Sequence, residues 1–111
     1  MPTVNSQGDL TADGTEQNVW DVTTNKHFYG FIDLENMQSG DTVILRKYLK
    51  IRSAGVATLT LADPPETYTD SQAAKGNIIR FTPEGIDVEY KVTLEQTTGT
   101  NRVYPWKIYE T

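Results

Sequence analysis

The chain of 111 residues contains no cysteine. This absence excludes disulfide bridges, thiolate zinc sites and cysteine nucleophiles, so stability has to come from packing. Long apolar runs are also missing, since no stretch approaches the roughly 20 residues that a membrane-spanning helix needs. The opening residues, MPTVNSQGDL, lack the basic start and apolar centre of a signal peptide. We therefore expect no membrane partner, and a protein that stays in the cytosol or leaves it only as part of an assembly.

Basic residues are few and unevenly spread. The chain has 10 Lys and Arg against 15 Asp and Glu, a formal net charge of -5. Nucleic-acid binding relies on clustered bases that neutralise phosphates, so the overall charge argues against a nucleic-acid partner. Lys26 is the only base in the first 45 residues, after which the segment RKYLKIR brings four within seven positions. This segment is better suited to an acidic protein surface than to nucleic acid.

Residues that carry chemistry are equally scarce. The single histidine, His27, lies inside a predicted strand, and no serine has an obvious partner for nucleophilic catalysis. Asp87 and Glu89 lie two residues apart on one strand face, a spacing that any solvated strand shows. The loop acids Asp63, Glu66 and Asp70 match no calcium-loop pattern. We predict no catalytic residue, no metal site and no cofactor.

Period-two alternation is the main signal that is present. In HFYGFIDL, one face carries Phe28, Gly30, Ile32 and Leu34, and the other carries His27, Tyr29, Phe31 and Asp33. One apolar face is enough to form a core. Because the second face is also apolar, we expect another part of this chain or another molecule to cover it.

Short alternating segments separated by turn residues predict an all-β fold. Strands are expected at 17–22, 27–34, 42–51, 56–61, 77–81, 86–96 and 102–110. About seven short strands without a convincing helix are typical of a single antiparallel β-sandwich or a jelly-roll-like domain. We assign residues 17–111 to this domain and the polar residues 1–16 to an N-terminal arm. Pro105 cannot donate to a ladder, which favours an edge position or a bulge for the last strand.

The strand at 42–51 supplies most of the candidate interface. If Val43, Leu45, Leu49 and Ile51 face the core, Lys47 shares their face and must reach out at the rim. The interface candidates of the chain, all on the outward phase, are Tyr29, Phe31, Ile44, Tyr48, Arg46, Lys50 and Arg52. If the two strands are neighbours, the apolar members form one patch that meets a partner, with the three bases pairing acidic groups there. The alternative is that the arm or the 62–77 loop covers them.

Two segments of the sequence resemble those of a known family. Together with TADGTEQ, the segments FIDLENMQSGDTVILRKYLKI and YKVTLEQTTGTNRVYPWKIY resemble small proteins encoded by tailed phages, archaeal viruses and related mobile elements. In that family DLxNMxxGDxVxLRxY and KxTLxQTxGTxRxFxWxV recur. The chain departs from the family at Gly30 and Lys47, which are more often apolar there, and at Ile44, which is more often polar. The resemblance implies a β-sandwich and a virion setting, without a mechanism.

This resemblance leads to a hypothesis about function. We expect a non-enzymatic virion protein, a capsid decoration or cement protein that reinforces a shell by binding the major capsid protein or another virion protein. A homo-oligomer is expected, and threefold sites of a shell would suit a trimer. One alternative is a tail-associated or host-surface module that binds carbohydrate through Tyr68, Trp20 or Tyr109. Another is a glycan hydrolase that uses two carboxylates.

Overall fold

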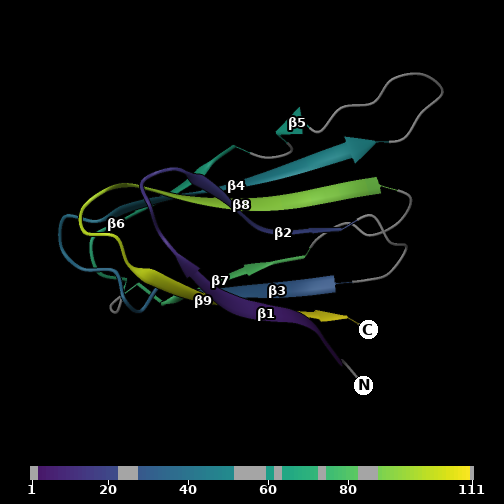
Figure 1. The fold of residues 1–111 in the computed structure, drawn as a ribbon, viewed down its shortest axis with the longest axis horizontal. Coiled ribbons are helices and arrows are strands. Elements are labelled where there is room, and N and C mark those ends of the chain that lie inside the picture. The colour runs from purple at the N-terminus through teal and green to yellow at the C-terminus, as the bar shows by residue number, and fades with distance from the viewer. Residues whose placement is uncertain are drawn as a thin grey trace.

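The structure is a computed structural model that describes residues 3–22, 28–51, 60–61, 64–72, 75–82 and 88–110. Within this part of the chain there are nine strands and no helix (Figure 1). The strands are β1 (Thr3–Thr11), β2 (Glu16–Val22), β3 (Phe28–Asp33), β4 (Thr42–Ile51), β5 (Thr60–Leu61), β6 (Glu66–Thr69), β7 (Ile78–Phe81), β8 (Val88–Thr98) and β9 (Val103–Glu110). His27, Arg52, Asp63 and Asp87 lie outside the described residues, as do the side chains of Lys50 and Glu89 and residues 56–59 of a predicted strand.

The strands form two antiparallel sheets that lie one above the other (Figure 1). The first sheet has the order β1-β9-β3-β7. The second has the order β2-β8-β4-β5. β5 and β6 pair with the same edge of β4, β6 along its first half and β5 along its second half. Two stacked antiparallel sheets confirm the prediction of an all-β sandwich.

The core lies between the two sheets and follows the predicted alternation. On β3, Phe28 and Ile32 are buried, and Leu34 just after it is buried too. The second sheet contributes Val43, Leu45, Tyr90, Val92 and Leu94, and the first sheet adds Ile79, Phe81, Tyr104 and Ile108. Because each strand sends alternate residues inward, each sheet keeps a second face that points away from the core.

Two inward positions that depart from the resembled family have clear roles. A Cβ on Gly30 would lie 2.6 Å from Cδ1 of Ile108 and would overlap Phe81, so only glycine lets those side chains meet over β3. Lys47 follows the inward phase of β4, and its ammonium lies 3.8 Å from Oε1 of Glu66 on β6. Its side chain is 18% exposed, as expected for a lysine that reaches the rim.

The N-terminal segment corrects the predicted domain boundary. Residues 1–16 were expected to be an arm outside the sandwich, yet Thr3–Thr11 form β1, which pairs with β9 along its length. The inward positions of β1 hold small or half-buried residues such as Gly8, whose backbone lies against the indole of Trp106. A polar edge strand of this kind carries too few apolar residues to produce an alternation signal.

Two further expectations are wrong. β9 is an interior strand between β1 and β3, although Pro105 predicted an edge or a bulge. The β3–β9 ladder reaches only to Trp106, the residue that follows Pro105 in the sequence, so the missing N–H interrupts no pairing on that side. The segment expected to be irregular also contains β6, which pairs with β4 from Thr42 to Leu45. Prolines and turn-forming residues flank this short strand, so the sequence pattern gives no strand signal there.

Candidate binding surfaces

The outer face of the first sheet carries an aromatic cluster. Tyr29 and Tyr109, which are register partners on β3 and β9, stack with ring centroids 5.5 Å apart. Phe31 meets Tyr29 and Tyr109 edge to face, each at 6.0 Å. The ammonium of Lys107 lies 5.3 Å from the ring centroid of Tyr109. All three rings are partly exposed, so this sheet places an aromatic surface on the side away from its core.

A depression of about 410 Å³ adjoins this cluster. Its apolar lining includes Phe31, Pro105 and Ile78, and Ile78 is 40% exposed. Polar groups surround them, and the remaining lining residues are Gln7, Gly8, Asp9, Asp33, Trp106 and Lys107. The surface can therefore offer apolar contact together with charges of both signs.

The outer face of the second sheet is different, because its charged groups already satisfy one another. Arg46 on β4 donates to Glu95 on β8 at 2.7 Å and lies 3.9 Å from Glu16 on β2. The hydroxyls of Tyr48 and Thr93 both donate to Oε2 of Glu16, each at 2.5 Å. This group, which we call the Glu16 network, ties three neighbouring strands together.

The pKa values in the Glu16 network follow from these contacts. Hydrogen bonds from Thr93 and Tyr48 lower the pKa of Glu16, and the nearby Arg46 and Lys91 charges lower it further. The same hydrogen bond to Glu16 raises the pKa of Tyr48. A general acid in glycoside hydrolysis needs a raised carboxyl pKa. The pKa of Glu16 is lowered instead. Glu16 and Glu95 therefore form an ion-pair network around Arg46.

The structure does not unite the predicted interface residues in one patch. Tyr29 and Phe31 lie on the first sheet, whereas Ile44, Arg46 and Tyr48 lie on the outward phase of β4 in the second sheet. β3 and β4 are not neighbours, so the prediction of a single patch is wrong. Ile44 is half-buried between Glu95 and Thr67 on the adjacent strands.

The residues proposed for sugar recognition are also separated. Trp20 is buried, meets Phe28 edge to face and donates to Asn5, so it is a core residue. Tyr68 packs against the core and donates to Glu66, and burial raises its pKa to about 12. Only Tyr109 lies on an exposed face, within the aromatic cluster.

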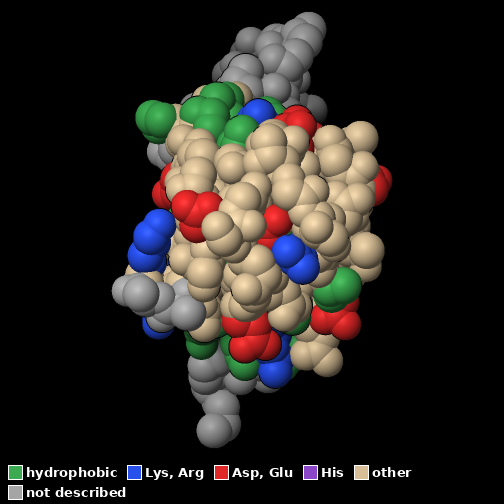
Figure 2. Space-filling view, turned by 90° about the vertical axis from the view of Figure 1, so that its left-hand side faces the viewer, with side chains coloured by type: hydrophobic (Ala, Val, Ile, Leu, Met, Phe, Trp, Pro, Cys, Tyr) green, Lys and Arg blue, Asp and Glu red, His purple; other side chains and the backbone are tan. Residues whose placement is uncertain are grey.

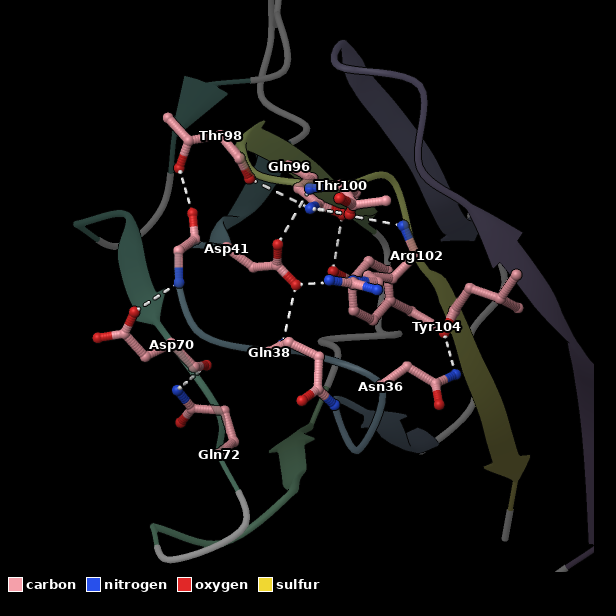
Figure 3. A network of polar contacts seen from close by, with 12 residues as sticks. Asn36, Gln38, Asp41, Asp70, Gln72, Gln96, Thr98, Thr100, Arg102 and Tyr104 are labelled. Atoms are coloured by element: carbon pink, nitrogen blue, oxygen red, sulfur yellow. Dashed lines mark hydrogen bonds and ion pairs between the residues drawn. The ribbon is translucent and has the colours of Figure 1, made fainter.

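Another network of polar residues lies at the end of the sandwich where the turns gather (Figure 3). Asp41, 1% exposed, accepts from the backbone N–H of Gln38 and Thr100 and from Nε of Arg102 at 2.8 Å. Gln96 donates to the carbonyls of Thr98 and Thr100 and accepts from the hydroxyl of Tyr104. This Asp41 clasp joins the turn before β4 to the β8–β9 hairpin.

The residues of the Asp41 clasp come from two segments that lie far apart in the sequence. Asp41 belongs to the first segment, and Gln96, Gly99 and Arg102 belong to the second. Asn36 adds another link, since its side-chain amide donates to the carbonyl of Val103 at 2.7 Å. Figure 2 faces this end, where uncharged polar groups and backbone dominate and acidic and basic side chains are interspersed. These polar residues therefore have a structural role at the turns.

Comparison of the chain with protein-family models, with curated proteins and with solved structures gave no match. The resemblance to virus-encoded proteins therefore stays a prediction from two sequence segments. Within the described residues, no three His, Cys, Asp or Glu side chains are grouped to hold a metal ion. No helix in the described part of the chain is long and apolar enough to cross a membrane.

Several residues of the aromatic face could not be found from the sequence. Lys107, Arg80, Pro105 and Asp9 join it because β1, β9, β3 and β7 are neighbours. These strands are far apart in the sequence, and β1 was not predicted. The outward phase of VYPWKIY was the one available signal for Lys107 and Tyr109.

Proposed function

We propose that this chain is a non-enzymatic structural protein of a virion, a decoration protein that binds the capsid shell and reinforces it. The outer face of the first sheet is the proposed association surface. The observation that carries the proposal is the cluster of Tyr29, Phe31 and Tyr109 on the sheet face opposite the core.

Aromatic residues support an association role for physical reasons. A solvated sheet face normally presents polar side chains, because apolar area left in water forgoes roughly 25 cal/mol per Å² of burial. Here Ile78 and Val103 also lie on the outward phase and are 40% and 38% exposed. Aromatic residues are enriched at the centres of protein interfaces, and arginine is also common there. Arg80 lies beside Phe31 in the β3–β7 register.

The second sheet is the weaker candidate for the same role. Its outward Arg46 and Tyr48 are engaged with Glu95 and Glu16 within the chain. A partner that used these groups would have to break contacts that already exist. The proposed shell contact therefore excludes the Glu16 network.

Multivalency makes a modest interface sufficient for a decoration protein. A shell presents many equivalent sites, and linked copies bind with an avidity well above that of one contact. The proposed partner is the major capsid protein or a neighbouring virion protein.

The proposal is tested on particles of the virus that encodes the chain. Mass spectrometry of purified particles and electron cryomicroscopy should find the chain on the outer surface of the head in many copies. Absence from the particle, or a position on the tail alone, would contradict shell decoration.

A carbohydrate-binding role is the second candidate, and the depression beside Phe31 favours it. An apolar ring next to Asp9, Asp33 and Gln7 combines a stacking surface with hydrogen-bonding groups for hydroxyls. Nuclear magnetic resonance titration with host-surface glycans distinguishes the two roles. Shifts confined to the depression, without shell binding, would favour the carbohydrate module.

A further inference from the structure

The strand register arranges the outer face of the first sheet in rows across the strands. One row, the long row, contains Gln7, Lys107, Phe31 and Arg80, which are successive register partners on β1, β9, β3 and β7. In the adjacent row, the short row, Asp9 pairs with Pro105 and Asp33 pairs with Ile78. Asp33 follows Ile32, the register partner of Trp106, and Asp33 and Pro105 both line the depression.

The two rows differ in shape and in charge. Long side chains form the first row, whereas the second holds two aspartates, a proline and an isoleucine. The depression of about 410 Å³ is lined by residues of both rows, as expected for a ridge beside a trough. The long row carries two positive charges and the short row two negative charges. Among the described residues, neither Asp9 nor Asp33 forms an ion pair within 4.0 Å.

We propose that the occupant of this face is a second copy of the chain in a symmetric dimer. A twofold axis that runs across the strands, between the two rows, places the long row of each copy over the short row of the other. Such a two-fold contact requires a self-complementary surface. Ridge then meets trough, and positive charges meet negative charges, at both halves of the contact. The aromatic cluster is covered at the same time.

The central contact of this dimer involves Lys107. Neighbouring strands are about 4.8 Å apart, so Asp9 and Asp33 flank Pro105 with Cα atoms about 10 Å from each other. Lys107 of the second copy would lie above Pro105, between these two carboxylates. Two like charges that flank a small apolar residue are favourably bridged by one cation. Pro105 leaves room for the lysine stem, and Phe31 of each copy packs near Asp33 and Ile78 of the other.

This inference rests on the proposed function, because the dimer covers the same association surface. The dimer is the state of the chain before it binds a shell, and the shell then displaces the second copy. It is tested by sedimentation equilibrium of the full chain with three variants. Lys107→Glu and Asp9→Lys each bring like charges together in the dimer. Lys91→Glu makes the same charge change as Lys107→Glu, but on the second sheet, and is its matched control. Circular dichroism verifies that each variant is folded.

The expected result is a dimer for the wild type and for Lys91→Glu. Each variant on the first sheet weakens the dimer by about tenfold or more, because like charges face one another across the contact. An equimolar mixture of Lys107→Glu and Asp9→Lys forms a heterodimer, since the new glutamate of one copy faces the new lysine of the other, and the second half of the contact keeps its wild-type charges. Because misfolded chains would not associate on mixing, recovery of the dimer shows that both variants are folded.

Three outcomes overturn the dimer. The wild type remains a monomer up to about 1 mM, it forms a trimer, or Lys107→Glu associates as well as Lys91→Glu. Co-sedimentation with shells separates this failure from that of the proposed function. A chain that is monomeric in solution and still binds shells refutes the dimer and leaves shell decoration in place.

Discussion

The carboxylate of Asp41 packs directly against the Cα of Gly99. A Cβ at residue 99 would overlap Oδ1 of Asp41 and would lie 2.8 Å from its Cα, so no other residue fits while the carboxylate keeps its place. Gly99 also has φ of 93°, in the left-handed region that favours glycine. The β8–β9 hairpin and the turn before β4 are thus matched to each other at these two residues.

Gly99→Ala should therefore destabilise the protein strongly. A positive φ costs an alanine about 1 to 2 kcal/mol, and displacement of Asp41 adds the loss of hydrogen bonds to a buried charge, for a total above about 3 kcal/mol. Gly76→Ala is the control, because Gly76 has φ of 94° and open space around its Cα. Urea denaturation gives both values. Equal losses for the two variants would show that the contact with Asp41 contributes nothing.

Asp41 should make stability depend on acid pH. Burial raises the pKa of Asp41, but hydrogen bonds from Arg102, Gln38 and Thr100 and the Arg102 charge lower it below the ordinary 3.8. The unfolded chain then takes up a proton at this carboxyl before the folded chain does. The stabilising contribution is present above pH 3.8 and is lost as the pH falls toward the pKa of the folded state.

Melting curves between pH 7 and pH 2.5 measure this effect. Asp41→Asn should lower the free energy of unfolding by about 2 kcal/mol at pH 7, since Arg102 and a backbone N–H lose a charged acceptor. The variant should also show a shallower fall with acid, with a remainder from Glu16, whose pKa is also lowered. An identical acid profile in both proteins would rule out Asp41 as a source.

Phe28 and Phe31 test the two faces of one strand. Phe28 is 4% exposed in the core, so Phe28→Ser should cost about 3 to 5 kcal/mol or prevent folding. Phe31 lies on the outer face, and Phe31→Ser should cost about 1 kcal/mol, mainly through its contacts with Tyr29 and Tyr109. Thermal melts of dilute samples compare the two. Similar losses for both would make Phe31 a core residue.

Tyr48 should matter for stability and not for association. Its hydroxyl donates to Glu16 at 2.5 Å in a half-exposed site, so Tyr48→Phe should cost about 0.5 to 1 kcal/mol. Removing the hydroxyl also removes one of the hydrogen bonds that lower the pKa of Glu16. Urea denaturation at pH 7 gives the stability loss. A wild-type midpoint would show that the bond to Glu16 is energetically neutral.

Much of the fold could be predicted because its main strands alternate strictly. The inward faces of β3, β4 and β8 follow from period two, including Gly30 and Lys47, whose residue types alone would not indicate an inward position. β1 and β6 could not be predicted, because polar residues and flanking prolines give no periodic signal. Their pairing comes from neighbouring strands, which one sequence does not reveal.

The candidate surface was predictable only in part for the same reason. Alternation identifies Tyr29 and Phe31 as outward residues, but it does not say which strands lie beside β3. The prediction joined them to Ile44 and Tyr48, which lie on the other sheet. The actual neighbours, Tyr109 and Lys107, are brought there by the β3–β9 register across a separation of more than 70 residues. Pairing between distant strands is thus the missing information.

Co-sedimentation with capsid shells of the proposed virion tests the central claim most directly. The wild type, Phe31→Ser and Tyr48→Phe are compared at equal concentration, after their folded state has been verified. Shell binding should be lost in Phe31→Ser and retained in Tyr48→Phe, because the proposed association surface lies on the first sheet. Retention by Phe31→Ser together with loss in Tyr48→Phe would contradict this account.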